Sequence, residues 1–334
     1  IEPTFPDIIN PFNPLVIRKF RERLSNINPD VSLVMGITDL IFMPITVDLS
    51  PCIFLPQGGE KSRAIGVAEW TNSRIRNLYY KKIYRRMFTK LLDQTDQVWN
   101  AEPVRPIFKD LGMDMDKFVP FDWVPVNTTK FSPSNNPISY AENVPVIGSF
   151  RRLRGTLLKP SLETFIESLG LLRRRSVRFQ AVVGGIYESG ESSELESLLD
   201  RLIKKNRLED RVIRQYMVPK NELPKYYSAL DIYLNMTHRG LNGAIGTCSK
   251  EAMACGCCYL SFDDPSPEYT ITQCENGVIV PHKVDELADS LQYLINNPSK
   301  MKDLGDAARR TATKEFDSLQ IGKKIRTQCS DIIS

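Results

Sequence analysis

Segments with the apolar spacing of helices alternate with short apolar runs along the first part of this chain. Apolar residues recur at helical spacing in 12–27, and runs typical of buried strands follow in 28–36 and 51–60. A long helix is predicted over 74–95 and a short strand over 96–101. Strands that alternate with helices predict a parallel sheet covered by helices on both faces.

The alternation begins again after 124–145, a segment rich in Pro, Asn and Ser that has the composition of a linker. The strands predicted in this second part are 145–150, 178–185, 211–218, 231–236, 257–262 and 277–281. The predicted helices are 159–173, 192–206, 222–230, 284–297, 299–316 and one around Glu251. We therefore expect two α/β domains, with ligands at the carboxyl ends of the strands and in the cleft between the domains.

Composition excludes some classes of function. The chain has 334 residues, of which 42% are hydrophobic and 25% charged, as is usual for globular proteins with two domains. A net charge of only +4 argues against a dedicated nucleic-acid binder but allows a local basic site for an anion. No apolar run reaches about 18 residues, so no membrane-spanning helix is expected.

The seven cysteines lack the spacing of a disulfide framework, and no secretory signal is visible, which indicates a cytoplasmic protein. Cys255, Cys257 and Cys258 form the run CGCC, which lacks the usual two-residue spacers of a metal site and has no histidine close by. We expect these cysteines to be small buried apolar residues, with neither a metal nor a cofactor at the site.

The stretch NGAIGTCSKEAMACG places two glycines before a helix that carries Glu251. Gly243 and Gly246 would let the backbone approach a ligand, and Thr247 or Ser249 could cap the first turn. The N–H groups and the dipole at a helix start favour an anion such as a phosphate. A tight turn without a ligand is the alternative interpretation.

Longer stretches resemble glycosyltransferase family 4, a retaining family with the GT-B fold. The similar stretches are FQAVVGG, DRVIRQYMVPKNELPKYYSALDIYLNM, GAIGTCSKEAMACGCCYLSF, PSPEYTITQCENGVIVP, VPVNTTKFSP, VPVIGSFRRLRG and the terminal KEFDSLQIGKKIRTQC. The resemblance implies two Rossmann-like domains that face a cleft. Residues 1–133 with a crossing helix at 318–334 would form the acceptor side, and 134–317 the nucleotide-sugar donor side. The family's opening strand is not evident, so the first domain is expected to be shortened or incomplete.

The resemblance also implies roles for single residues. Glu251, in EAMA, matches the glutamate that binds the donor's ribose hydroxyls, a task that suits a carboxylate. The backbone of 244–248 would hold the diphosphate or sugar, and 215–218 would contact the base. Glu268 matches the glutamate of a glycine-rich turn, although the family's glycines are absent here. The donor-binding residues expected on this basis are Glu251, Gly246, Thr247, Cys248, Gly243, Tyr216, Met217 and Glu268.

Basic residues follow the first strand of the predicted donor domain, where the family places an arginine and a lysine on the donor phosphates. Arg154 falls at the lysine position, whereas Ser149 falls at the arginine position, so Arg151 or Arg152 would have to substitute. Lys159 is a further candidate. Arg154, Arg152 and Lys159 would stabilise the departing diphosphate as catalytic cations. A solvated basic loop is the alternative.

Two departures from the family pattern leave the activity open. The first glutamate of the family's E-x7-E motif is replaced by Gly243, and 232–250 contains no Asp or Glu. The family's first-domain histidine is replaced by Gln57, in LPQGGE. One hypothesis is a retaining, metal-independent transferase that moves a hexose-type sugar from a nucleotide-diphosphate sugar to a hydroxyl of a glycan or glycolipid. The other is a non-catalytic relative that binds a nucleotide sugar or a partner protein.

The segment 74–90 carries seven basic residues and no acidic one, with aromatic residues between them. Such a helix could lie on an anionic membrane surface, where lipid-linked acceptors reside. The alternative is a helix that packs its aromatic residues on the first sheet and exposes its basic residues to water. The expected partners are thus a nucleotide sugar, a glycan or lipid-linked acceptor and a membrane periphery, but not a nucleic acid.

Overall fold

The computed structural model describes residues 22, 25–35, 51–56, 85–150, 158–185, 192–216, 218–236, 246–263 and 270–333. By its internal contacts the chain divides into two compact units. The chain passes from the first unit to the second between Trp123 and Val124, and it returns to the first unit after Gly322. No helix in the described part of the chain has the length and apolar character needed to span a bilayer.

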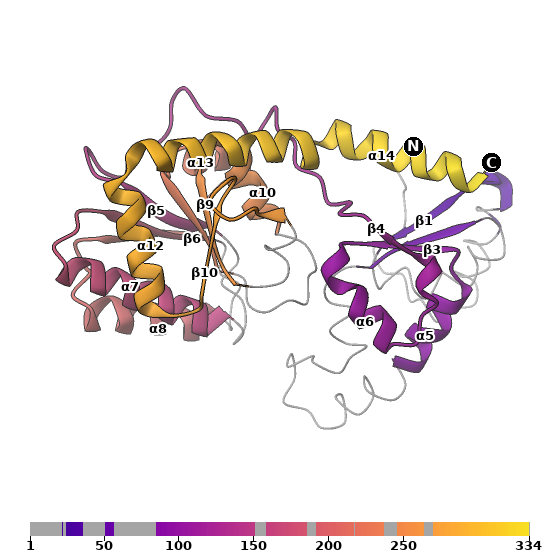
Figure 1. Cartoon of the computed structure of the whole chain (residues 1–334), viewed down its shortest axis with the longest axis horizontal. Helices are drawn as coiled ribbons and strands as arrows, with labels where there is room; N and C mark the ends of the chain where they lie inside the picture. The colour runs from indigo at the N-terminus through magenta and orange to yellow at the C-terminus, as the bar shows by residue number, and fades with distance from the viewer. Residues whose placement is uncertain are drawn as a thin grey trace. The chain divides into compact units, whose positions relative to one another are not determined.

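The first unit contains a four-stranded parallel sheet in the order β1-β2-β3-β4 (Figure 1). Its elements are β1 Ser32–Met35, β2 Cys52–Leu55, α5 Arg85–Gln94, β3 Gln97–Asn100, the 3₁₀ turn η3 Glu102–Val104, α6 Arg105–Asp110, the 3₁₀ turn η4 Met115–Lys117 and β4 Phe118–Pro120. Every residue of β2 is buried, and Phe54 contacts Phe88 of α5 edge to face, with 5.9 Å between ring centroids. The strands at 28–36, 51–60 and 96–101 are thereby confirmed, whereas α6 and β4 are too short to give a recognisable pattern.

The second unit contains a six-stranded parallel sheet in the order β10-β9-β8-β5-β6-β7. Its strands are β5 Val146–Phe150, β6 Gln180–Gly185, β7 Val212–Tyr216, β8 Ile232–Asn235, β9 Cys258–Phe262 and β10 Val278–Val280. Strands β5, β6 and β7 follow one another towards one edge of the sheet. Strand β8 then pairs with the other side of β5, and β9 and β10 continue towards the opposite edge. The direction of winding therefore reverses between β5 and β8, and open α/β sheets bind ligands beyond the carboxyl ends of the strands at such a point.

Helices cover both faces of this sheet, with α7, α8 and α12 on one face and α10 on the other, while α13 contributes buried residues to the core clusters of both faces (Figure 1). Their bounds are α7 Lys159–Arg174, α8 Ser192–Lys205, α9 Leu223–Tyr227, α10 Thr247–Ala254, α12 Val284–Asn296, α13 Pro298–Thr311, the π-helical turn η6 Ala312–Phe316 and α14 Ser318–Ile333. The sequence predicted one helix over 299–316. The structure instead ends the α-helical part at Thr311 and continues with the π-helical turn.

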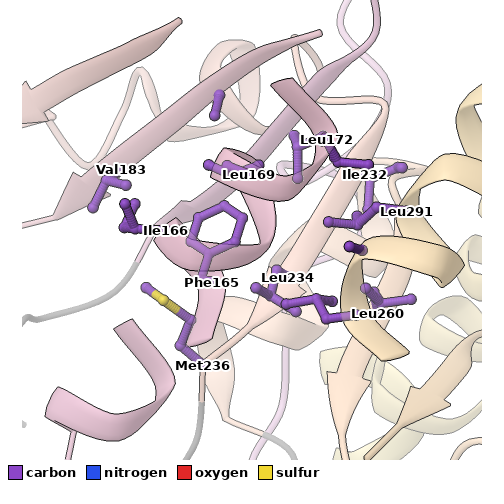
Figure 2. Packing of buried hydrophobic residues seen from close by; sticks show 14 of the residues in the cluster. Phe165, Ile166, Leu169, Leu172, Val183, Ile232, Leu234, Met236, Leu260 and Leu291 are labelled. Carbon is purple, nitrogen blue, oxygen red and sulfur yellow. The ribbon is translucent and has the colours of Figure 1, made fainter. Parts of the chain in front are cut away.

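Phe165 of α7 lies at the centre of the larger core cluster (Figure 2). Figure 2 shows it among Ile232 and Leu234 of β8 and Leu291 of α12, and all four side chains are fully buried. The intervening residue Tyr233 belongs to the cluster on the opposite face. Strand β8 is therefore apolar on both faces, which explains why central parallel strands appear in the sequence as continuous apolar runs.

Helix α13 packs closely against the turn that follows α10. Gly256 occupies that turn with φ +85°, a conformation that favours glycine, and a Cβ at Gly305 would overlap its carbonyl oxygen. Gly305 therefore lets the backbone of α13 approach the backbone of the turn. This contact fixes α10 relative to the sheet.

Gly305→Ala should destabilise the second unit, even though alanine is favoured over glycine in a helix by about 1 kcal/mol. The clash is with backbone, so we expect the free energy of unfolding to fall by roughly 1–3 kcal/mol. Urea unfolding of the full chain measures this change. Gly322→Ala in α14 is the matched control, because a Cβ there meets no described atom within 4 Å and should be neutral or stabilising. Equal stability of the two variants would contradict close packing at Gly305.

Candidate functional site

Helix α10 begins beside the point where the sheet reverses its winding direction, since it follows β8 in the chain. Gly246 is its N-cap, and the carbonyl of Gly246 accepts hydrogen bonds from the N–H groups of Ser249 and Lys250 at 3.0 and 3.2 Å. Thr247 occupies the first helical position. The expected side-chain cap is therefore wrong, because the residue at the cap position is a glycine without a side chain.

No described residue crowds the side-chain position of Gly246. A Cβ built on Gly246 meets no described atom within 4 Å. Its φ of −62° and ψ of 157° are extended values that any residue adopts, so the backbone conformation does not require glycine here. Gly246 lies at the positive end of a helix dipole, where an anion is stabilised.

Glu251 lies one turn into α10 and is 8% exposed. The hydroxyl of Tyr227, in α9, donates a hydrogen bond of 3.1 Å to its Oε2 atom. Within the described part of the chain, Tyr227 is the only residue that donates a hydrogen bond to this carboxylate. The acceptor capacity that remains on Glu251 suits a ligand that presents hydroxyl groups.

Burial raises the pKa of Glu251 above its ordinary value of 4.5, and three groups oppose that change. They are the Tyr227 hydrogen bond and the positive charges of Lys220 and Lys130. Burial also raises the pKa of Tyr227 well above its ordinary value of 10.0, so its hydroxyl stays protonated and continues to donate.

Tyr227 is the residue of this site that sequence reasoning missed. Its ring packs against those of Phe131, Phe150 and Tyr233, with centroid separations of 6.2, 5.7 and 5.9 Å. These contacts fix the direction of its hydroxyl towards Glu251. The Tyr-Tyr pair in ELPKYYSAL was the available signal, but an aromatic residue before a buried strand is equally typical of plain core packing.

The cysteines of CGCC are buried in this unit as free thiols. Burial raises the pKa of Cys255 and Cys258 to about 12, and it raises the pKa of Cys257 well above 9.0. The Cys257 thiol donates to the carbonyl of Tyr227 at 3.1 Å. Protonated, buried thiols of this kind behave as small apolar residues, and thiolates are the form that binds metals. Among the described residues, no three His, Cys, Asp or Glu side chains gather as a metal would require.

The structure places some of the other expected site residues and leaves several undescribed. Lys159 is exposed at the first position of α7, which follows β5 in the chain. Tyr216 ends β7, the edge strand of the sheet. Gly246, Thr247, Cys248 and Glu251 lie together at the start of α10. The expected residues that lie outside the described part of the chain are Arg151, Arg152, Arg154, Gly243, Met217, Glu268 and Gln57.

Solved structures share this architecture. The structure of HepE from Anabaena matches with a TM-score of 0.72 and 17% identity, over 95% of this chain and 82% of that one. A glycosyltransferase from Rickettsia africae matches with a TM-score of 0.72 and 17% identity, over 99% and 85%. Sucrose-phosphate synthase from Thermosynechococcus elongatus matches with a TM-score of 0.69 and 16% identity, over 95% and 78%. These matches confirm the GT-B fold.

A search of curated proteins found no match. The family model described as glycosyl transferases group 1 matches residues 141–311, which is just over half of the chain and includes all of α10. This chain therefore belongs to the glycosyl transferases group 1 family.

Proposed function

We propose that this protein is a retaining glycosyltransferase of family 4, which moves a hexose-type sugar from a nucleotide-diphosphate sugar to an acceptor hydroxyl without a metal. The observation that carries the proposal is the start of α10, where the buried Glu251 carboxylate lies one turn from Gly246, whose side-chain position no described atom approaches within 4 Å. Structures of Anabaena HepE contain UDP, UDP with glucose, and UDP-glucose, which supports a nucleotide sugar as the donor.

Each group would have a separate task in this reaction. The helix start at Gly246, Thr247 and Cys248 would bind the diphosphate, and Glu251 would accept hydrogen bonds from the ribose hydroxyls. Negative charge grows on the diphosphate as the bond to the sugar breaks, and positive groups aimed at that charge lower the barrier. The remaining tasks fall to Arg154, Arg152 and Lys159 at the leaving diphosphate, Tyr216 and Met217 at the base, and Gly243 and Glu268 beside the sugar.

The acceptor proton needs a base, and 232–250 offers no carboxylate. An oxygen of the departing phosphate would take that proton, so this step requires no carboxylate base from the protein. The acceptor would be a glycan or a lipid-linked hydroxyl bound by 1–133 with 318–334, and 134–317 would bind the donor. Within 74–90, Phe88 packs on the first sheet and Arg85, Arg86 and Lys90 are exposed, so any membrane contact would be made by such exposed basic residues.

A second candidate is a relative that binds a nucleotide sugar without transferring it. Gly243 in place of a motif glutamate, and Gln57 in place of a histidine, favour this alternative. Both candidates require nucleotide binding at α10. They differ in turnover of the bound nucleotide sugar, which release of the free nucleotide reports.

The proposed donor site predicts that one nucleotide among UDP, GDP, ADP and CMP, or a sugar conjugate of these, raises the Tm. A ligand at a hundredfold excess over its Kd stabilises by about 2.7 kcal/mol. In Glu251→Gln the Kd should rise about 10- to 100-fold, because hydrogen bonds to a charged group contribute roughly 1.5–3 kcal/mol. Titration calorimetry of both proteins measures this difference.

Glu286→Gln is the control for that experiment, since Glu286 is an exposed carboxylate in the first turn of α12. It should bind the nucleotide as the wild type does. A panel without any Tm rise at millimolar nucleotide would overturn the donor site, and equal affinity of Glu251→Gln and wild type would overturn the role of Glu251.

Gly246→Ala should weaken nucleotide binding while leaving the fold largely intact. The extended backbone of Gly246 accommodates alanine, although alanine is a poorer N-cap than glycine, so the free energy of unfolding should fall by no more than about 1 kcal/mol. A methyl group in the space meant for the diphosphate should nevertheless weaken nucleotide binding roughly tenfold. Gly322→Ala again serves as the control. Unchanged affinity in Gly246→Ala would show that the nucleotide does not approach this backbone.

The raised pKa of Glu251 predicts opposite pH dependences for stability and binding. The folded state tolerates protonated Glu251 better than ionised Glu251. Protonation therefore stabilises the folded state below pH 4.5, and this stabilisation is lost as the pH rises through the raised pKa of Glu251. The permanently neutral Glu251→Gln should therefore have the higher Tm without ligand near about pH 8, and the difference should vanish near about pH 4. Nucleotide binding to the wild type should strengthen over the same rise, because an ionised carboxylate accepts ribose hydroxyls better. Melting curves with and without nucleotide test both trends, and a Tm difference that is constant with pH would contradict them.

A further inference from the structure

Lys250 is a fully buried lysine in the first turns of α10. Lysine is almost never fully buried unless its charge is compensated. Its Nζ atom donates a hydrogen bond of 2.8 Å to the carbonyl of Val124 and lies 4.5 Å from the centroid of the Phe316 ring. One ammonium group therefore holds two segments that are far apart in the sequence.

Both of these segments lie close to the points where the chain passes between its two units. Val124 is the first residue of the second unit, and Phe316 ends the π-helical turn that leads into α14, in which the chain leaves that unit. The two segments also pair with each other. The N–H of Val126 donates to the carbonyl of Phe316 at 2.8 Å, and the N–H of Ser318 donates to the carbonyl of Val126 at 3.0 Å. We call residues 124–128 and 316–318 the crossover bridge.

Further bonds tie the crossover bridge and α10 together. The hydroxyl of Thr128 donates to the carboxylate of Asp317, which strengthens the bridge itself. At the other end of α10, the guanidinium of Arg309 donates to the carbonyl of Ala254. Arg309 belongs to α13, which runs directly into the π-helical turn. Helix α10 is thus bonded to the crossover bridge through Lys250 and, through the carbonyl of Ala254, to α13, which leads into the bridge.

Lys250 and Glu251 are neighbours in sequence, and consecutive residues of a helix point about 100° apart. Glu251 contacts Tyr227 of α9, whereas Lys250 contacts the crossover bridge. The short helix therefore carries the proposed ribose ligand on one side and the attachment to the bridge on another. A small movement of α10 on ligand binding would be passed to the bridge through the Lys250 side chain.

We propose that Lys250 is a positioning residue that couples nucleotide occupancy at α10 to the crossover bridge. The inference rests on the proposed function, because it needs a nucleotide at Gly246 and Glu251. A methionine at this position would fill a similar volume. It would remove the Lys250 donor from the carbonyl of Val124, and with it one directional bond between α10 and the bridge.

Hydrogen exchange followed by mass spectrometry tests the coupling on the full chain. The probe is UDP at saturating concentration, or the member of the nucleotide panel that raises the Tm most. In the wild type, bound nucleotide should slow exchange of the Val126 and Ser318 amides at least about fivefold, the lower end of typical couplings between sites. Lys250→Met should bind the nucleotide within about threefold of the wild-type Kd but show no ligand-dependent change at these two amides.

Lys300→Met is the matched control. Lys300 also donates from Nζ to a backbone carbonyl, that of Cys274 at 3.0 Å, but it lies on α13 at the surface of the unit. It should behave as the wild type does in both measurements. Should Lys250→Met fail to fold, Phe316→Leu gives a second test, because it removes the ring against the ammonium and keeps the site apolar. This variant should also reduce the ligand-dependent protection.

The possible results separate the coupling from the proposed function. If nucleotide binds to the wild type without slowing exchange at Val126 and Ser318, the coupling is wrong and the donor site stands. If Lys250→Met, or Phe316→Leu in its place, keeps the full protection, the role of Lys250 is wrong. If no nucleotide binds to the wild type, the proposed function fails, and the coupling fails with it.

Discussion

Helix α10 buries two ionisable side chains in consecutive positions, and the arrangement of the second unit depends on how each of them is compensated. Lys250 and Glu251 do not neutralise each other, because the helix directs them to different sides. The ammonium donates to the carbonyl of Val124 and lies against the ring of Phe316, and the carboxylate accepts from the hydroxyl of Tyr227. Each buried charge therefore fixes α10 to a different neighbour. The close packing of Gly305 against the following turn completes the constraint.

The charge of Glu251 is compensated incompletely. Burial still raises the pKa of Glu251, so its hydrogen bond and the nearby lysine charges do not fully offset the loss of water. Such a group costs stability in the free protein and becomes better compensated when a ligand supplies more donors. Sites that bind ligands commonly retain this kind of uncompensated group, because a ligand that donates hydrogen bonds to it gains binding free energy. The buried cysteines nearby show the contrast, because their protonated thiols require no ligand.

Much of the second unit could be predicted from sequence because its central strands are apolar on both faces and its helices are long enough to show their period. Strand β8 and helix α7 are clear examples. Strand β4 and helix α6 escaped prediction because three and six residues are too few for a pattern. The position of Glu251 followed from a motif, but its partner Tyr227 did not, since only packing shows where an aromatic hydroxyl points. The burial of Lys250 was not predicted either, because a lysine near the start of a helix usually lies in water.

The sequence departures and the preserved site belong to physically different parts of the proposed reaction. The groups that would bind the nucleotide lie within α10, where the structure shows a helix start capped by Gly246 and a carboxylate bonded to Tyr227. In the proposed reaction, Gly243 would stand where the family pattern has a glutamate at the sugar, and Gln57 would stand where it has a histidine. Loss of those two groups would reduce stabilisation of the transition state without removing any contact to the ribose or the diphosphate. On the proposed function, nucleotide affinity and transfer rate would therefore be separable, and a slow transferase and a non-catalytic binder would share the same donor site.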